Sequence, residues 1–355
     1  MSERARTLRS RSARFEIRVR RRWYEKSEQE LLRTRLADLG LELAKTPIAR
    51  RVERLKRELA AREIAFQPHV WLSTSWFSPD GVPGLAVPFY LAHPRLLRME
   101  EQHTGEAEGA DGAGAMKLLR HEAGHALDSA FRLHASKGWR DTFGAFSTRY
   151  RADYAPRPFR REFVLHLDAW YAQSHAAEDF AETFAVWLDP RSDWRVTYAA
   201  WPCIWKLEWI DARMHELAGR RAPVTNRETP WALDECEWTL AQYYAHKRAR
   251  RERERAPKLD RELRARFAPR SEAAPSSAAR RHVAELLREL ERTNRKLPFD
   301  ERYVQREIVR TLALRGDRLG LAIDAGAPKA RLKSLLSLGP TILESWKLGR
   351  QRHLR

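Results

Sequence analysis

Two histidines and a glutamate in the segment HEAGH, residues 121–125, have the types and spacing to bind a metal ion and use it. In a helix, residues four apart lie on one face, so the imidazoles of His121 and His125 can reach a single ion. Glu122 lies about 100° further round the helix, beside the ion, where a carboxylate can take a proton from water. This HExxH arrangement predicts a zinc site that hydrolyses a bond. The helix is expected to be buried, because its neighbouring positions are Leu118, Leu119, Ala126, Leu127 and Ala130.

A hydrolytic zinc ion needs a third protein ligand and keeps its fourth position for water. In one class of these enzymes the third ligand follows on the same stretch of chain, with glycine at position 128 and a ligand at position 131. Here those positions are Asp128 and Phe131, which excludes that class. Asp128 is expected to support the site from outside the ligand set, by steadying a ligand or by capping a neighbouring backbone group.

The third ligand is therefore expected on a second helix, in the segment AEDFAETFAVWL, residues 177–188. Glu178 and Glu182 are four apart and share a face in an otherwise aromatic helix. Buried carboxylates are costly unless they bind a metal or accept hydrogen bonds. We expect Glu178 to be the ligand and Glu182 to accept a hydrogen bond from a ligand imidazole. An acidic face in solvent is the alternative, and His175 is a competing ligand or substrate contact.

The two segments together resemble the gluzincin metallopeptidases. HEAGHALD is followed, 53 residues after His125, by the glutamate-containing helix, and the segment WFSPDGVPGLAVPFYLAHPRL (76–96) is also similar. The likeness is greatest to a bacterial family of zinc-binding metallopeptidases and more distant to the protease domain of lethal-factor-type toxins. It covers about residues 15–245 and implies a zincin-like fold.

The resemblance also implies roles for single residues. It makes His121, His125 and Glu178 the ligands and Glu122 the general base. In the lethal-factor type a tyrosine seven residues before the third ligand lies near the reacting carbonyl, and Tyr171 has that spacing. Tyr171 could then donate a hydrogen bond to the oxyanion. Packing beside its aromatic neighbour is the other role open to it.

The helices and strands expected to position these residues indicate an α+β fold. Apolar periodicity indicates helices, short apolar runs indicate strands, and the acidic, glycine-rich stretch 101–115 indicates a loop. Pro88 places its strand at a sheet edge or at a bulge. Trp201, Trp205 and Trp209 recur every four residues and predict a buried helix face. The helices are expected at 48–63, 116–133 and 177–188, and the strands at 66–73 and 85–92.

The chain divides into four expected regions. A disordered basic tail (1–15) precedes a zincin-like metallopeptidase domain (16–246). A basic, Pro/Ser/Ala-rich linker (247–279) then leads to a small appended C-terminal helical module (280–355). In that module, apolar residues at helical spacing indicate two helices before Pro328 and one or two after it.

Charge is distributed unevenly along the 355 residues. The net charge of +19 comprises +9 in residues 1–60, −5 in residues 61–245 and +15 in residues 246–355. The basic flanks could bind a polyanion or an acidic partner. With two cysteines a disulfide scaffold is excluded, and no apolar run is long enough to span a membrane. We expect a cytoplasmic location without membrane association.

The sequence thus predicts a metallopeptidase that binds one zinc ion per chain and hydrolyses peptide or protein substrates. The alternative is a non-catalytic zinc-containing module that binds nucleic acid or another polyanion through its basic flanks. Glu122 discriminates between them, because a structural site needs no general base beside an open position. A third hypothesis, compatible with the first, is that the C-terminal helices dock a partner.

Overall fold

The structure is a computed structural model that describes residues 23–151, 153–252, 257–270, 276–323, 326–348, 351 and 352. The expected tail at residues 1–15 lies outside this range. The helices and strands up to residue 217 are α1 (Glu28–Leu32), α2 (Ala49–Ala61), β1 (His69–Ser73), β2 (Gly84–Pro88), α3 (Pro94–Thr104), α4 (Gly112–Phe131), α5 (Lys137–Phe143), β3 (Asp153–Tyr154), α6 (Ala176–Leu188), α7 (Trp194–Thr197) and α8 (Ile204–Leu217). The later elements are α9 (Leu240–Glu252), α10 (Pro257–Arg266), α11 (Ser276–Thr293), α12 (Phe299–Arg318), α13 (Pro328–Leu336), α14 (Gly339–Leu348) and β4 (Gln351–Arg352).

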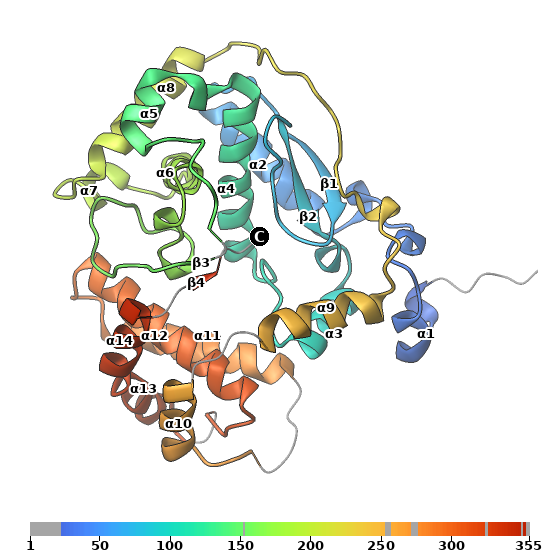
Figure 1. The fold of residues 1–355 in the computed structure, drawn as a ribbon, viewed down its shortest axis with the longest axis vertical. Helices are drawn as coiled ribbons and strands as arrows, with labels where there is room; N and C mark the ends of the chain where they lie inside the picture. The colour runs from blue at the N-terminus through green and yellow to red at the C-terminus, as the bar shows by residue number, and fades with distance from the viewer. Residues whose placement is uncertain are drawn as a thin grey trace, which may run out of the picture.

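Helix α4, which contains the HEAGH segment, runs through the middle of the molecule. It packs against α6 on one side and against α2 and β2 on the other, as Figure 1 shows. The C-terminal helices α10 to α14 gather at one end of this arrangement. Because α4 is covered on both sides, its side chains from Ala115 to Ala130 are almost all buried.

Local sequence determines where α4 begins and which neighbours hold it. Asp111 caps the helix by accepting a hydrogen bond from the amide of Gly114 at 2.7 Å. Arg120 is fully buried and forms ion pairs with Glu58 of α2 at 2.7 Å and with Asp189, directly after α6, at 2.8 Å. Such pairs hold a buried charge only if its hydrogen bonds are satisfied. Arg120 therefore ties three helices together beside the histidines.

The sheet content is small. β1 and β2 form a parallel two-stranded sheet in which Ser73 pairs with Pro88. The strand expected at 85–92 ends at Pro88, and residues Phe89–Ala92 continue as a 3₁₀ helix. Proline cannot donate to the ladder, which fits its place at the last position of a strand. The chain is mostly helical with a small sheet, which is compatible with the α+β class.

Two local expectations are wrong in part. The loop expected at 101–115 is shorter, because α3 extends to Thr104 and α4 begins at Gly112 under the Asp111 cap. The tryptophan face is also incomplete: Trp201 is buried before α8 begins, but Trp205 is 42% exposed and Trp209 is half-buried. Four-residue spacing marks a common helix face but does not show that another element covers it.

The C-terminal helices pack against the rest of the protein, although a linker was expected to separate them from it. The expected boundary after residue 246 falls inside α9, and part of the expected linker forms α10 with buried Leu259 and Leu263. The helices expected in the module are present as α11 to α14. Their apolar side chains belong to the same continuous core as those of α4 and α6. Within the described residues, no helix is long and apolar enough to cross a membrane.

Candidate metal centre

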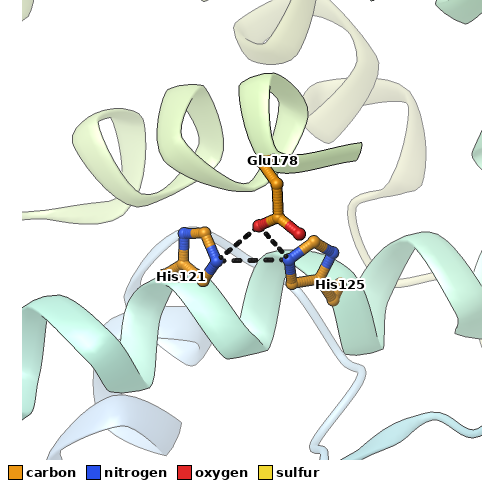
Figure 2. A group of neighbouring side chains, drawn as sticks. All are labelled: His121, His125 and Glu178. Atoms are coloured by element: carbon orange, nitrogen blue, oxygen red, sulfur yellow. Dashed lines mark hydrogen bonds and ion pairs between the residues drawn. The ribbon is translucent and has the colours of Figure 1, made fainter. Parts of the chain in front are cut away.

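His121 and His125 of α4 and Glu178 of α6 direct their side chains to one point (Figure 2). The Nε2 atoms of the two histidines are 3.2 Å apart. Oε2 of Glu178 lies 3.0 Å from Nε2 of His121 and 3.1 Å from Nε2 of His125. All three side chains are buried. The sequence-predicted ligands from two helices are thus brought together in space.

Gly124, inside the HEAGH segment, permits the close approach of the two helices. A Cβ atom at this position would lie 3.0 Å from Cα of Ala181 and 3.2 Å from the ring of Phe184 in α6. The first neighbour is backbone, which cannot rotate away. Glycine therefore lets α6 pack directly on α4, and this short separation brings Glu178 within reach of both imidazoles. The motif spacing alone does not predict this role of Gly124.

The chemistry of this donor set fits a metal ion. Carboxylates only accept hydrogen bonds, so Nδ1 of His121, at 2.8 Å from Oε1 of Glu182, carries the hydrogen. In the neutral ring its Nε2 is then a bare acceptor. This atom faces a carboxylate oxygen and a second ring nitrogen, an arrangement that a shared cation stabilises. Ligand atoms round a tetrahedral zinc ion lie about 3.3 Å apart, since each Zn–N bond is about 2.0–2.1 Å.

Glu182 of α6 links α4 to the segment that precedes α6. Besides His121, its carboxylate accepts a hydrogen bond from the amide of Leu167 through Oε2 at 2.8 Å. The side chain is fully buried, and both oxygens are used. It therefore orients one imidazole and also fixes the segment that leads to Tyr171. Its hydrogen bond with His121 is the contact expected from the sequence.

The electrostatics of the pocket favour positive charge. Burial lowers the pKa of His121, but hydrogen bonds to Glu178 and Glu182 outweigh burial and raise it to about 10. Burial also raises the pKa of Glu178, yet the charges and hydrogen bonds of His125 and His121 hold it well below its usual range. The two carboxylates thus favour a positive charge where the imidazoles meet, which a proton on Nε2 of His121 supplies without a metal and which a bound cation would supply in its place.

Tyr150, which the sequence reasoning missed, contacts the third ligand. Its hydroxyl donates to Oε1 of Glu178 at 3.0 Å, so it holds the oxygen that the histidines do not contact. Its ring stacks on His175 with centroids 3.7 Å apart. Tyr150 lies between α5 and β3, outside any helix or strand, and it has no spacing relation to the glutamates that could have identified it.

His175 is occupied elsewhere and is not a competing ligand. Its Nδ1 accepts a hydrogen bond from the amide of Ala177 at 3.1 Å, which makes it the N-cap of α6. Its Nε2 bonds the carbonyl of Thr148 at 2.7 Å. Both ring nitrogens therefore have backbone partners.

Of the two roles expected for Asp128, steadying a ligand or capping a backbone group, the structure shows the second. Its Oδ1 accepts from the amide of His134 at 2.8 Å, and its Oδ2 contacts Nδ1 of the same residue at 2.8 Å. The side chain caps the turn after α4. It lies one turn beyond His125 and is directed to the helix end, so it stabilises the fold rather than the metal centre.

Glu122 and Tyr171 line the same small cavity as the three ligands. The cavity has a volume of about 20 Å³, enough for one water molecule. The ring of Tyr171 lies 5.7 Å from that of His121 and is buried. Glu108, from the turn between α3 and α4, lines another wall, and burial raises its pKa to about 7. The two proposed catalytic groups thus face the ligand set.

Comparisons with protein-family models, with curated proteins and with solved structures find no match to this chain. The resemblance to gluzincins stated above therefore rests on the motif residues of the sequence.

Proposed function

We propose that this protein is a zinc-dependent peptidase of the gluzincin type, with a zincin-like arrangement of its two ligand helices. The observation that carries the proposal is the convergence of His121, His125 and Glu178 on one point with Glu122 in the same cavity. A structural zinc site is closed by four protein ligands, whereas a catalytic site has three and leaves one position open. Three ligands beside a carboxylate favour catalysis.

Each residue then has a part in hydrolysis. His121, His125 and Glu178 would hold one zinc ion, which when bound polarises a carbonyl and lowers the pKa of water to about 7. Glu122 takes the proton from the attacking water and passes it to the leaving amine. Tyr171 donates a hydrogen bond to the oxygen on which negative charge develops. Tyr150 and Glu182 keep the ligands in orientation through the contacts described above.

The size of the cavity sets a condition on this activity. A volume of about 20 Å³ accepts a water molecule but no peptide. A substrate must therefore present its reacting carbonyl at the mouth of the cavity or widen it, and loops that move to admit substrates are common in enzymes.

The binding-module alternative has weaker support. Several C-terminal basic side chains are paired with acidic ones inside the fold: Arg315 contacts Asp260 at 2.7 Å, and Arg331 contacts Glu285 at 2.7 Å. Part of the positive charge of that region therefore stabilises helix packing. Charge alone, without a recognition motif, is a weak indication of nucleic-acid binding.

The test compares wild type with Glu122→Gln, which keeps the size of the side chain and removes its basicity. The exposed Glu208 of α8 provides a matched control, Glu208→Gln. Each protein is loaded with zinc, its metal content is measured, and a diverse peptide pool is analysed by mass spectrometry after incubation.

Wild type and Glu208→Gln should cleave the same peptides. Glu122→Gln should bind as much zinc and cleave them roughly 10²–10⁴-fold more slowly. If zinc-loaded wild type cleaves no peptide that Glu122→Gln leaves intact, the peptidase proposal is wrong. Salt-dependent binding of a polyanion by the inactive protein would then support the alternative.

A further inference from the structure

The segment that carries Tyr171 has an unfavourable backbone conformation. It is the 3₁₀ turn Asp168–Gln173, in which Ala169 has φ 58° and Trp170 has φ 53°. Residues with a Cβ atom rarely adopt this left-handed region, and two in succession persist only where the surroundings hold them. The contacts of this turn therefore decide where Tyr171 points.

Many of these contacts come from α12, more than 130 residues further along the chain. Oε2 of Glu307 accepts a hydrogen bond from the amide of Ala169 at 2.9 Å. The hydroxyl of Tyr303 accepts from the amide of Trp170 at 3.2 Å and donates to the carbonyl of Leu167 at 2.5 Å. The backbone amides of Ala169 and Trp170 thus both donate hydrogen bonds to side chains of α12.

The ring of Trp170 packs against two C-terminal helices, α12 and α14. It meets the ring of Tyr303 edge-on, with centroids 5.4 Å apart, and that of Trp346 in α14 at 4.9 Å. Trp170 and Tyr171 are neighbours in sequence, so anchoring the first ring in the C-terminal region fixes the direction of the second. Trp170 is buried in these helices, and Tyr171 lines the metal cavity.

Arg310 of α12 joins this turn to the opposite wall of the cavity. One of its nitrogens lies 2.7 Å from Oδ2 of Asp168, at the start of the turn. Another lies 2.7 Å from Oε1 of Glu106, in the segment that also contains Glu108. The guanidinium presents several donors in a rigid plane, so it can hold both carboxylates at once. The two wall segments are therefore held by one side chain.

We propose that Tyr303, Glu307 and Arg310 are positioning residues of the metal site, holding the strained turn so that Tyr171 faces the cavity. On this basis the C-terminal helices complete the site rather than serve only to dock a partner. The inference rests on the proposed peptidase function for its effect on rate. Its structural part, the dependence of the turn on α12, stands separately.

The test uses Tyr303→Phe, which keeps the ring beside Trp170 and removes the hydroxyl, and Arg310→Gln, which removes the charge. The exposed Arg302 on the same helix gives a matched control, Arg302→Gln. Hydrogen exchange of residues 167–173 is measured on the zinc-loaded full-length proteins, together with zinc content and melting temperature. The kcat and KM for a cleaved peptide are measured for each variant alone and in a Tyr171→Phe background.

Both variants should keep their zinc, and exchange should become roughly tenfold faster in residues 167–173 while α4 and α6 stay protected. Their kcat should fall by about 10- to 100-fold with little change in KM, because a small misplacement of a catalytic group is costly. In the Tyr171→Phe background the same substitutions should lower kcat no further, since they act through that hydroxyl.

Unchanged exchange in residues 167–173 for both variants would overturn the inference. So would a loss of kcat that is equally large with Tyr171→Phe. If wild type cleaves no peptide, the proposed function fails, and the exchange measurement still decides whether α12 holds the turn.

Discussion

Glu182→Gln tests how far the metal centre depends on a residue that does not bind the metal. The carboxylate has two acceptor oxygens, and each faces an N–H group at 2.8 Å, from His121 and from Leu167. Glutamine has the same shape but offers one acceptor and one NH₂ donor. While His121 keeps its hydrogen on Nδ1, the NH₂ meets an N–H group whichever way the amide turns, and one buried donor is left without an acceptor.

The expected magnitude follows from that loss. A hydrogen bond to a charged group contributes about 1.5–3 kcal/mol, and a buried donor without a partner costs a similar amount. If the amide oxygen turns to Leu167, the ring of His121 must move its hydrogen to Nε2, which is the atom that faces the metal. We therefore expect zinc affinity to fall by about 10- to 100-fold, in the range found for residues that orient metal ligands.

The assay is competition for zinc between the protein and a chelator of known affinity, at one fixed pH. Glu208→Gln is again the matched control and should bind zinc as wild type does. Glu182→Ala, which leaves both N–H groups without an acceptor, should bind at least as weakly as Glu182→Gln. Equal zinc affinity of wild type and Glu182→Gln would refute the argument that this carboxylate determines the hydrogen position on His121.

Four further substitutions provide three more tests. Gly124→Ala should push α6 from α4 at Ala181, so zinc affinity should fall although no ligand changes; unaltered affinity would contradict the packing argument. Glu178→Ala should abolish tight zinc binding, as measured by elemental analysis. His175→Ala should keep the zinc and lower the free energy of unfolding by about 0.5–2 kcal/mol, because His175 caps a helix. If His175→Ala lost the zinc and Glu178→Ala kept it, the two roles would be exchanged. Burial and the charge of Asp168 raise the pKa of Glu307 from 4.5 to about 8. Between these two pH values the folded state holds a proton that the unfolded state has lost, so the free energy of unfolding falls as pH rises from 4.5 to 8. Glu307→Gln cannot titrate, so urea unfolding should show its stability relative to wild type increasing over that range; parallel curves would exclude the effect.

The parts of the site that the sequence predicted are local or rest on a strong energetic constraint. His121 and His125 follow from helical periodicity alone, which requires no knowledge of the fold. Glu178 and Glu182 follow from the cost of two carboxylates in an aromatic helix. The helices α2, α4 and α6 were predicted to within a few residues for the same reason, since apolar spacing determines both periodicity and burial. For the C-terminal region the spacing indicated helices before and after Pro328 without fixing their bounds.

Other features of the site were decided by tertiary structure. Asp128 could have supported a ligand or capped a turn, and only the fold of the chain after α4 brought His134 to it. Tyr150 lies in an irregular segment, where no periodicity restricts the direction of a side chain. Within the expected linker, α10 packs Leu259 and Leu263 into the core against partners that its own sequence does not reveal.

The sequence by itself determined which residues can bind a metal, because ligand type and helical spacing are properties of a short segment. Tertiary structure decided how close α4 and α6 lie, and it placed α12 against the turn that carries Tyr171. Both depend on contacts between segments far apart in the chain, and in each the local sequence permits other arrangements. Gly124 permits close packing without requiring it, and Ala169 and Trp170 adopt a conformation that they would not adopt alone. The free energy that favours these arrangements comes from the packing of the whole core, so neither arrangement can be predicted from the sequence of one segment.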